Sequence, residues 1–293
     1  MPREHLCQSR GMPRATREKA PLTLLLPPSE TKRPGGDGPA LDLPALAFPA
    51  LLPVRERLLT ALTELASTAV AGDDPAPALT ALGLSPGQRD QLELDAALAT
   101  APTGPALLRY TGVLYDAFDP AGLTPAQRRR AADRVVIASA LFGAVRGGDP
   151  IPAYRFSAGS RLPGFGTLTA LWKPVLGPVL ADLPGLVVDL RSGAYAQLAP
   201  VRDAVTVRVL YIAPDGSRSV VSHFNKHAKG LLARALATTT ATVADADAVV
   251  RVAAAAGLPA ERHGTHGVDV LLYEPPAGTP AARRAAAAAA RAE

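Results

Sequence analysis

The 293-residue chain has little sulfur and few aromatic side chains, with one cysteine, two methionines and 4% aromatic residues. A lone Cys7 excludes an internal disulfide framework and a cysteine-based metal site. No apolar run reaches the roughly 18 residues needed to span a bilayer, and Leu22–Leu26 is too short for a signal-peptide core. The phosphate loop Gly-x-x-x-x-Gly-Lys-Ser/Thr is also missing. We therefore expect a protein of the reducing cytoplasm, without membrane contact, metal or cofactor.

The excess of positive charge lies at the two ends of the chain. The formal net charge is +5 and the isoelectric point is about 9.6. Residues 1–20 hold five basic and two acidic side chains, and residues 278–293 hold three basic and one acidic, which leaves 21–277 formally neutral. We expect a disordered basic extension (1–20), one folded domain (21–277) and an Ala/Arg-rich tail (278–293). Nucleic-acid binding by the domain would then need a local basic patch, because affinity depends on the cations that face phosphates.

The pattern of apolar residues predicts a mixed α and β fold. Short apolar or alternating runs predict strands at 22–27, 135–141, 186–191, 205–213, 217–223 and 268–273. Helical spacing predicts helices at 54–70, from Pro125 to Arg134, at 167–180 and from residue 224 or 225 to 236. The fold class is therefore α/β (mixed α+β), with a central mixed sheet surrounded by helices in a single domain.

Two basic or glycine-containing helical segments have alternative interpretations. Leu79–Leu84 and Gln88–Ala99, joined by a glycine turn, are similar to a helix-hairpin-helix, whose backbone amides approach DNA phosphates. Two core helices joined by a tight turn explain the same pattern more simply. The run Arg128–Arg130, followed by Arg134, is typical of a solvated helix face more often than of a binding surface.

Charged and hydroxyl-bearing side chains are concentrated after the strand expected at 135–141. Gly143 ends the apolar run, and a loop stiffened by two prolines follows it. That loop holds Arg146, Asp149, Tyr154 and Arg155. Because loops position polar groups on a rigid scaffold, this loop is a candidate for function.

The helix expected near residue 225 has a basic side. At 100° per residue, Lys226, Gly230 and Arg234 share the face opposite the apolar one, and Lys229 flanks it. Lysines near a helix N-terminus with a glycine between them suit close approach by a phosphate, although a solvated amphipathic helix gives the same pattern. His223 and His227 have zinc-ligand spacing, but the glutamate of a metalloprotease is replaced by Phe224, so we expect no metal here.

Hydroxyl and amine groups follow two of the expected strands. Ser29, Thr31 and Lys32 come after 22–27, and Ser192 and Tyr195 come after 186–191. Ligands of open α/β sheets bind at the carboxyl ends of the strands. We therefore expect these loops to meet the loop after Gly143 in one cleft. Its lining would suit an anion, a phosphate backbone or a flipped base.

Five segments, in this order, resemble one known family. They are Leu25–Lys32, Arg109–Tyr115, Ser139–Arg155, Val187–Tyr195 and Val221–Leu231. The third segment is similar to the typical sequence of the peroxide-stress YaaA family at this place. It reads Ser-Ala-Leu-Phe-Gly-Ala-Val-Arg-Gly-Gly-Asp-Pro-Ile-Pro-Ala-Tyr-Arg. The resemblance covers roughly residues 22 to 275. The chain departs from the family pattern at Gly147, where proline is usual, and at Ala194, where glutamate is usual.

The resemblance implies a cytoplasmic protein of the peroxide stress response that limits oxidative damage and binds DNA, largely independently of sequence, through a basic cleft and a helix-hairpin-helix-like element. The residues expected to bind DNA or another anion are Ser29, Thr31, Lys32, Arg146, Tyr154, Arg155, Ser192, Tyr195, Lys226 and Lys229. Asp149 is expected to orient Arg146 or Arg155, and Tyr154 to stack on a base or sugar.

Two other functions stay open from the sequence. One is an enzyme of glycosylase or lyase type acting on a damaged base or nucleotide. The catalytic candidates for it are Lys32 or Lys226 as amine nucleophile, assisted by Asp149. The partner would then be a nucleotide or another phosphorylated small molecule. The other function is iron handling, which the motifs favour least because they contain few carboxylates and no useful cysteine.

Overall fold

The computed structural model describes residues 21–220 and 225–273. The expected tails (1–20 and 278–293) and His223 lie outside these residues. An eight-stranded sheet has the order β4-β3-β1-β6-β7-β10-β9, and β8 pairs with β7. The strands are β1 (Leu22–Leu26), β3 (Val135–Ser139), β4 (Gly143–Arg146), β6 (Leu186–Asp189), β7 (Val205–Ile212), β8 (Arg218–Val220), β9 (Ala260–His263) and β10 (Gly267–Leu272). Strands β3, β1, β6, β7 and β10 run parallel, whereas β4, β8 and β9 pair antiparallel. Two further strands, β2 (Gly104–Pro105) and β5 (Pro150–Ile151), form a separate two-stranded sheet. The prediction of a mixed α/β fold is confirmed.

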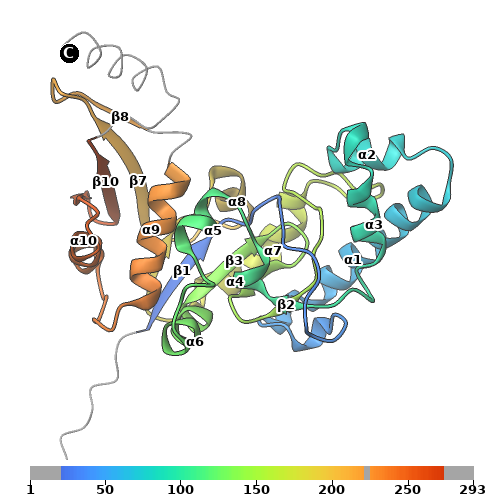
Figure 1. The fold of residues 1–293 in the computed structure, drawn as a ribbon, viewed down its shortest axis with the longest axis horizontal. Helices are drawn as coiled ribbons and strands as arrows, with labels where there is room; N and C mark the ends of the chain where they lie inside the picture. Colours follow the sequence, from blue (N-terminus) through green and yellow to red (C-terminus); the bar gives the residue numbers. More distant parts are fainter. Residues whose placement is uncertain (1–20, 221–224, 274–293) are drawn as a thin grey trace, which may run out of the picture.

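The helices form two groups, as Figure 1 shows. Those of the right-hand end are α1 (Leu52–Ala71), α2 (Ala76–Leu82) and α3 (Asp90–Ala96). The others accompany the sheet: α4 (Ala106–Arg109), α5 (Val113–Phe118), α6 (Pro125–Arg134), α7 (Leu168–Ala181), α8 (Gly193–Leu198), α9 (Asn225–Thr238) and α10 (Ala246–Ala255). Strands β7 to β10 and α10 form the left-hand end in Figure 1.

Part of the core lies around strands β1 and β3, each of which has a neighbouring strand on both sides. Every residue of both strands is buried, which requires cover on both faces of the sheet. Helix α9 packs on β1 and β7, and α6 packs on β1 and β4. This explains why these strands read as continuous apolar runs rather than as alternating patterns.

Most predicted elements are present within a few residues of their expected bounds. The helix expected at 88–99 is shorter, because α3 covers only Asp90–Ala96. It is preceded by a 3-10 turn at Pro86–Gln88, and the capping box of that turn joins Ser85 and Gln88. Strands β4 and β9 were missed because β4 begins at Gly143, which was interpreted as the end of a strand, and β9 (Ala-Glu-Arg-His) has no run of apolar residues.

The strand order creates a crevice at one place in the sheet. After β1 the chain next enters this sheet on one side, at β3, and after β6 it continues on the other side, at β7. Because β1 and β6 are parallel neighbours, their carboxyl ends face the same edge. The chain leaves them in opposite directions, and open α/β sheets bind ligands at such points.

The arginine run of α6 has a structural role. Arg134 Nη1 donates to the carbonyls of Leu236 (2.9 Å) and Thr239 (2.8 Å), and Arg130 Nη1 donates to that of Thr238 (2.6 Å). Arginines thus satisfy carbonyls at the C-terminus of α9 that lack partners within the helix. The expectation of a purely solvated face is wrong for Arg130 and Arg134.

Candidate functional site

A cleft of about 670 Å³ lies at the carboxyl ends of β1 and β6. The loop after β1 lines it with Pro27–Glu30, and the loop after β6 contributes Leu190, Ser192, Ala194 and Tyr195. The start of α5, the loop residues 157–159 and the first turn of α9 complete the wall. The predicted Ser29, Ser192, Tyr195, Lys226 and Lys229 therefore meet in one cleft.

Two lysines of α9 supply the positive charge of the cleft. Lys226 is exposed, and Lys229 is half-buried with its Nζ 3.4 Å from the carbonyl oxygen of Leu190. Burial lowers the pKa of Lys229, and the carboxylate of Asp189 opposes that effect. Because they are three residues apart on one helix, the two ammonium groups can face one anion.

A buried ion pair fixes the loop after β6. Arg191 donates to both carboxylate oxygens of Asp189, from Nε at 2.9 Å and from Nη2 at 2.7 Å. Nη1 of Arg191 also donates to the carbonyl of Tyr195 (3.3 Å). The Tyr195 hydroxyl accepts the N–H of Ala158 (3.3 Å), and burial raises the pKa of Tyr195 to about 12. The hydroxyl thus stays neutral and can donate a hydrogen bond at physiological pH.

Thr31 and Lys32 do not line the cleft, but both form hydrogen bonds with residues that do. Thr31 Oγ1 shares a hydrogen bond with Ser29 Oγ (3.3 Å) and accepts one from Thr111 Oγ1 (2.9 Å). Lys32 Nζ donates to the carbonyls of Ser29 (2.9 Å) and Glu30 (3.3 Å), two residues that line the cleft.

The Lys32 ammonium is enclosed by aromatic rings. Its Nζ lies 4.0 Å from the ring centre of Tyr154 and 5.4 Å from that of Tyr110. Burial lowers the pKa of Lys32 from 10.5 to about 7, although Asp95 opposes the shift. A substantial fraction of this amine is therefore neutral near pH 7.

Asp95 is a site residue that the sequence reasoning missed. It is fully buried; its Oδ1 accepts the N–H of Arg155 (2.7 Å), and its Oδ2 has no hydrogen-bond partner among the described residues. Burial raises the pKa of Asp95 to about 7, against the effects of the Arg155 N–H and Lys32. The signal was its spacing: Asp95 lies midway between the buried Leu92 and Leu98, on the apolar side of its helix.

Tyr154 does not face the cleft, so the expected stacking on a base is wrong for this structure. The side chain is buried, and its hydroxyl shares hydrogen bonds with Ser139 Oγ and with the Tyr110 hydroxyl, each at 2.8 Å. The ring also meets Phe142 edge-on, with centroids 5.4 Å apart. Tyr154 supports Lys32 instead.

Arg146 and Asp149 are not brought to the cleft. Asp149 Oδ2 accepts the backbone N–H groups of Arg146 (2.9 Å) and Ala47 (3.1 Å), so it fixes main chain rather than orienting a guanidinium. Arg146 Nη1 donates to the carbonyl of Asp133 (2.8 Å). Arg155 forms an ion pair with Glu30 (2.8 Å), a cleft residue. Arg155 thus contacts a residue of the cleft without lining it, whereas Arg146 and Asp149 lie away from the cleft.

Gly230 does not provide the predicted approach for a phosphate. It is buried, and a Cβ there would lie 2.3 Å from the carbonyl oxygen of Leu114. The glycine therefore allows α9 to pack closely on α5. Arg234 likewise faces α5, where Nη1 donates to the carbonyls of Phe118 (2.6 Å) and Asp119 (2.5 Å).

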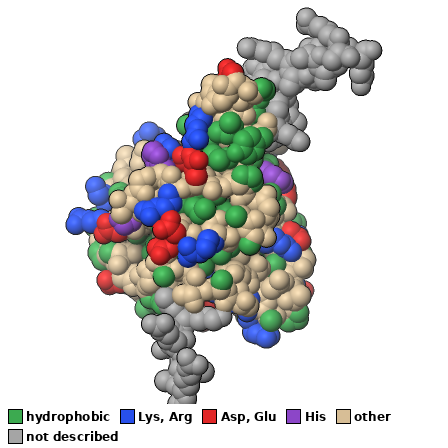
Figure 2. All heavy atoms as spheres, turned by 90° about the vertical axis from the view of Figure 1, so that its left-hand side faces the viewer, with side chains coloured by type: hydrophobic (Ala, Val, Ile, Leu, Met, Phe, Trp, Pro, Cys, Tyr) green, Lys and Arg blue, Asp and Glu red, His purple; other side chains and the backbone are tan. Residues whose placement is uncertain are grey.

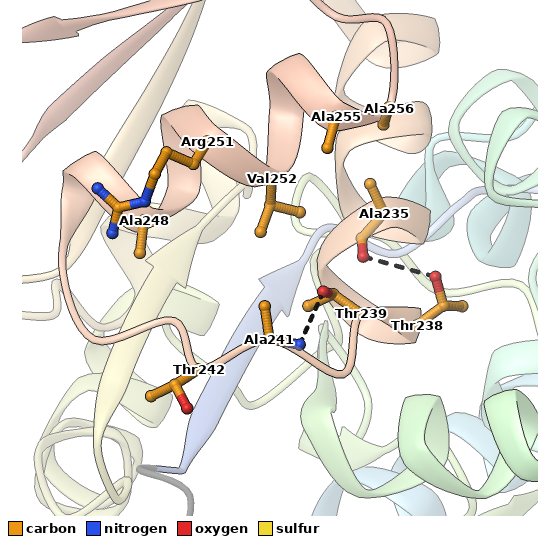
Figure 3. A pocket seen from close by; sticks show the side chains of 10 residues that line it. All are labelled: Ala235, Thr238, Thr239, Ala241, Thr242, Ala248, Arg251, Val252, Ala255 and Ala256. Atoms are coloured by element: carbon orange, nitrogen blue, oxygen red, sulfur yellow. Dashed lines mark hydrogen bonds between the residues drawn. The ribbon is translucent and has the colours of Figure 1, made fainter.

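A second pocket of about 470 Å³ lies between α9 and α10, and Figure 3 shows its lining of alanines, threonines, one valine and one arginine. The Thr238 hydroxyl donates to the carbonyl of Ala235 (3.5 Å), and Thr239 Oγ1 accepts the N–H of Ala241 (3.1 Å). With Arg251 as its one charged side chain, this pocket is a weaker candidate for binding an anion than the cleft.

The β9 end of the sheet carries balanced charge. Figure 2 shows basic and acidic side chains side by side on this face. The strands there contribute the ion pairs Arg208–Asp269 (2.6 Å) and Arg218–Glu261, and α10 contributes Asp247, paired with Arg262 (3.0 Å). Cations already paired in this way are poor phosphate ligands, which again favours the cleft.

Metal ligation and membrane insertion find no support within residues 21–220 and 225–273. No group of three or more histidine, cysteine, aspartate or glutamate side chains is placed to hold a metal ion there. None of the helices in those ranges has both the length and the apolar character needed to cross a bilayer.

Comparison with known proteins confirms the family resemblance. The model of the family described as peroxide stress protein YaaA matches residues 22–256. A UPF0246 protein of Corynebacterium efficiens is 49% identical over 244 residues, which cover 82% of this chain and 95% of the relative. UPF0246 proteins of Corynebacterium glutamicum (46% identical) and Streptomyces coelicolor (43%) each match 86% of this chain and 99% of their own length.

Proposed function

Because this chain belongs to the peroxide stress protein YaaA family, we propose that it serves the peroxide response by binding DNA in the cleft at the carboxyl ends of β1 and β6. The observation that carries the proposal is the convergence of Lys226 and Lys229 on the hydroxyls of Ser29 and Ser192. Lysines and hydroxyls are the side chains that contact phosphate and sugar oxygens in protein–DNA complexes.

The exposed turn between α2 and α3 offers a second contact surface. Gly83 adopts a left-handed conformation (φ 68°), and Ser85–Gly87 are exposed. This turn is tied to the cleft, because Ser160 Oγ donates to the carbonyl of Leu82 (3.3 Å) and the N–H of Arg161 donates to that of Ala81 (2.7 Å). Ser157–Gly159, just before these residues, line the cleft. A helix-hairpin-helix role for α2 and α3 therefore belongs to the same proposal.

Binding of this kind carries little sequence information. Contacts to phosphate and sugar position a protein on DNA, whereas contacts to base edges specify the sequence. We therefore expect weak sequence preference and a steep dependence on salt.

A salt series with full-length variants tests the proposal. Fluorescence anisotropy of a labelled duplex gives the slope of log K against log salt. Each lost phosphate contact should lower the magnitude of this slope by about 0.9. We expect that reduction for Lys226→Ala and a larger one when Lys229→Ala is added. Lys173→Ala is the matched control, since Lys173 is an exposed lysine on α7, and it should leave the slope unchanged.

The basic tails need their own control. A full-length variant with the seven arginines of residues 1–20 and 278–293 changed to glutamine lowers the formal net charge from +5 to −2. If that variant loses binding while Lys226→Ala retains the native slope, the cleft is not the binding site and the proposal is wrong.

One observation favours a second candidate function, an enzyme acting on a damaged base or nucleotide. Lys32 places an enclosed amine directly behind the cleft wall. Asp149, the predicted assistant of that amine, is engaged with main chain elsewhere. Iron handling stays a prediction that none of these contacts favours.

A further inference from the structure

An amine and a carboxyl group lie enclosed behind the cleft without forming an ion pair. The Lys32 Nζ binds two carbonyl oxygens, and among the described residues no carboxylate is within ion-pairing distance of it. Asp95 is buried with Oδ2 unpaired among those residues. Its Oδ1 accepts the N–H of Arg155 (2.7 Å), the residue after Tyr154, whose ring centre lies 4.0 Å from Lys32 Nζ. A buried carboxylate oxygen without a partner is costly, so it calls for an explanation.

A reaction with a carbonyl compound would account for both the Lys32 amine and the Asp95 carboxyl group. A desolvated lysine is the usual nucleophile for a carbonyl carbon, because only the neutral amine attacks. The Tyr154 ring 4.0 Å from Nζ would stabilise the positive iminium that forms, by a cation–π interaction. A carboxyl group nearby is needed to deliver and accept protons.

Building on the proposed function, we propose that Lys32 forms a Schiff base with an aldehyde carried on a phosphate ester in the cleft, and that Asp95 exchanges the protons. The phosphate would bind at Lys226 and Lys229. In DNA the corresponding group is the ring-opened sugar of an abasic site; a small sugar phosphate has the same chemistry.

The steps balance without an added reagent. The Lys32 lone pair attacks the aldehyde carbon, the C=O π electrons move to oxygen, and one proton passes from nitrogen to that oxygen, which gives a carbinolamine. Protonated Asp95 then gives its proton to the hydroxyl, which leaves as water while the nitrogen lone pair forms the C=N bond. An iminium and the Asp95 carboxylate remain, and hydrolysis reverses the sequence.

Access to Lys32 requires a small change at the cleft wall. The Glu30 side chain is 71% exposed and forms an ion pair with Arg155. Water and salt weaken an ion pair whose carboxylate is exposed in this way. An anion in the cleft competes with Glu30 for Arg155, and displacement of Glu30 opens the wall whose carbonyls bind Nζ.

Reductive trapping tests the inference with the full chain. The probes are a duplex with one abasic site and glyceraldehyde 3-phosphate, each incubated with cyanoborohydride and mapped by peptide mass spectrometry. We expect a reduced adduct at Lys32 of the native protein with at least one probe. Lys32→Met should abolish that adduct, Lys173→Ala should retain it, and Asp95→Asn should slow it by about tenfold or more. The trapping rate should pass through a maximum near pH 7, because the amine of Lys32 is protonated below its pKa of about 7 and the carboxyl of Asp95 has lost its proton above its pKa of about 7.

The outcomes separate this inference from the proposed function, because anisotropy measures DNA binding in the same samples. Adducts with the sugar phosphate, without DNA binding, would retain Lys32 chemistry and contradict the DNA proposal. Absence of a Lys32 adduct with both probes would overturn the inference while leaving DNA binding intact. An equal adduct yield in Lys32→Met would also overturn it. Mapping of the native protein locates the adduct even if a variant fails to fold.

Discussion

The segment 142–155 and the cleft differ in what their cationic side chains bind. Around the segment, arginines donate to main-chain carbonyls: Arg55 to Phe142 and Ala144, and Arg109 to Ile151. In the cleft, Lys226 is exposed and Lys229 has one long contact to main chain. A high density of charged side chains therefore does not identify the site, because a cation is available to a ligand only when its donors are not already used.

The two regions also differ in the type of cation: arginines surround the segment 142–155, and lysines line the cleft. The guanidinium has five donors in a rigid fork and suits several carbonyls at once, whereas the ammonium group is a compact charge on a flexible stem. The chain has few lysines, and Lys32, Lys226 and Lys229 lie in or directly behind the cleft. In this chain, the positions of the few lysines therefore point to the cleft better than the positions of the many arginines.

The largest effect should come from the arginine-supported region. Arg55→Ala removes donors to the carbonyls of Ala47, Phe142 and Ala144 and leaves a buried cavity. We expect a loss of about 3–5 kcal/mol in the free energy of unfolding, measured by urea denaturation. Arg57→Ala, an exposed arginine of the same helix, should cost less than about 1 kcal/mol. Similar losses for the two variants would contradict the structural role of Arg55.

Close packing of α9 on α5 should give the next largest effect. In Gly230→Ala the new methyl group must displace the Leu114 carbonyl, and we expect a loss of about 1–3 kcal/mol together with weaker DNA binding, because α9 carries Lys226 and Lys229. Gly166→Ala, where a Cβ meets nothing within 4 Å, should be neutral or slightly stabilising. Unchanged stability of Gly230→Ala would show that α9 adjusts freely.

The enclosed pair should make stability depend on pH in two opposite ways. Folding raises the pKa of Asp95 from 3.8 to about 7, so the folded state binds more protons in that window and this contribution falls as pH rises. Folding lowers the pKa of Lys32 from 10.5 to about 7, so the unfolded state binds more protons above pH 7 and this contribution rises with pH. Urea titrations at a series of pH values should show each slope, on the order of 1 kcal/mol per pH unit. Asp95→Asn should remove the first slope and Lys32→Met the second. If the native protein, Asp95→Asn and Lys32→Met showed the same dependence of stability on pH, the pKa shifts assigned to Asp95 and Lys32 would be wrong.

The smallest expected effect concerns the acidic residue of the cleft. Glu30 places an exposed carboxylate among groups that would face phosphate. Glu30→Gln removes a repulsion of about 0.5–1 kcal/mol, so DNA should bind about two- to fivefold more tightly by anisotropy. Glu93→Gln, an exposed glutamate of α3, is the control. Weaker binding by Glu30→Gln would show that Glu30 assists the ligand instead.

Much of the fold was predictable because it depends on local patterns. The strand Leu22–Leu26, with four leucines in five residues, and the Thr124 capping box of α6 are specified by residues close together in the sequence. The meeting of Ser29, Ser192 and Tyr195 was also predictable, since all three follow parallel strands.

The rest of the site depends on contacts between distant segments. The sequence around Gly230 does not reveal that this glycine packs against Leu114. The sequence around Tyr154 does not reveal that the Lys32 ammonium lies over its ring. Asp149 has the residue type of a functional carboxylate, and only the positions of Ala47 and Arg146 show that it binds main chain. Helical periodicity places a residue on a face but does not say what covers that face.

Site-specific cross-linking tests the location of the DNA site most directly. In a Cys7→Ser background, Ala194→Cys places the sole thiol in the cleft, and Ala256→Cys places it in the pocket between α9 and α10 (Figure 3). Both alanines are exposed, so a duplex with thiol tethers on its phosphates can reach either one. We predict disulfide cross-links at Ala194→Cys and few at Ala256→Cys. Equal yields at the two positions, or cross-links confined to Ala256→Cys, would contradict binding in the cleft.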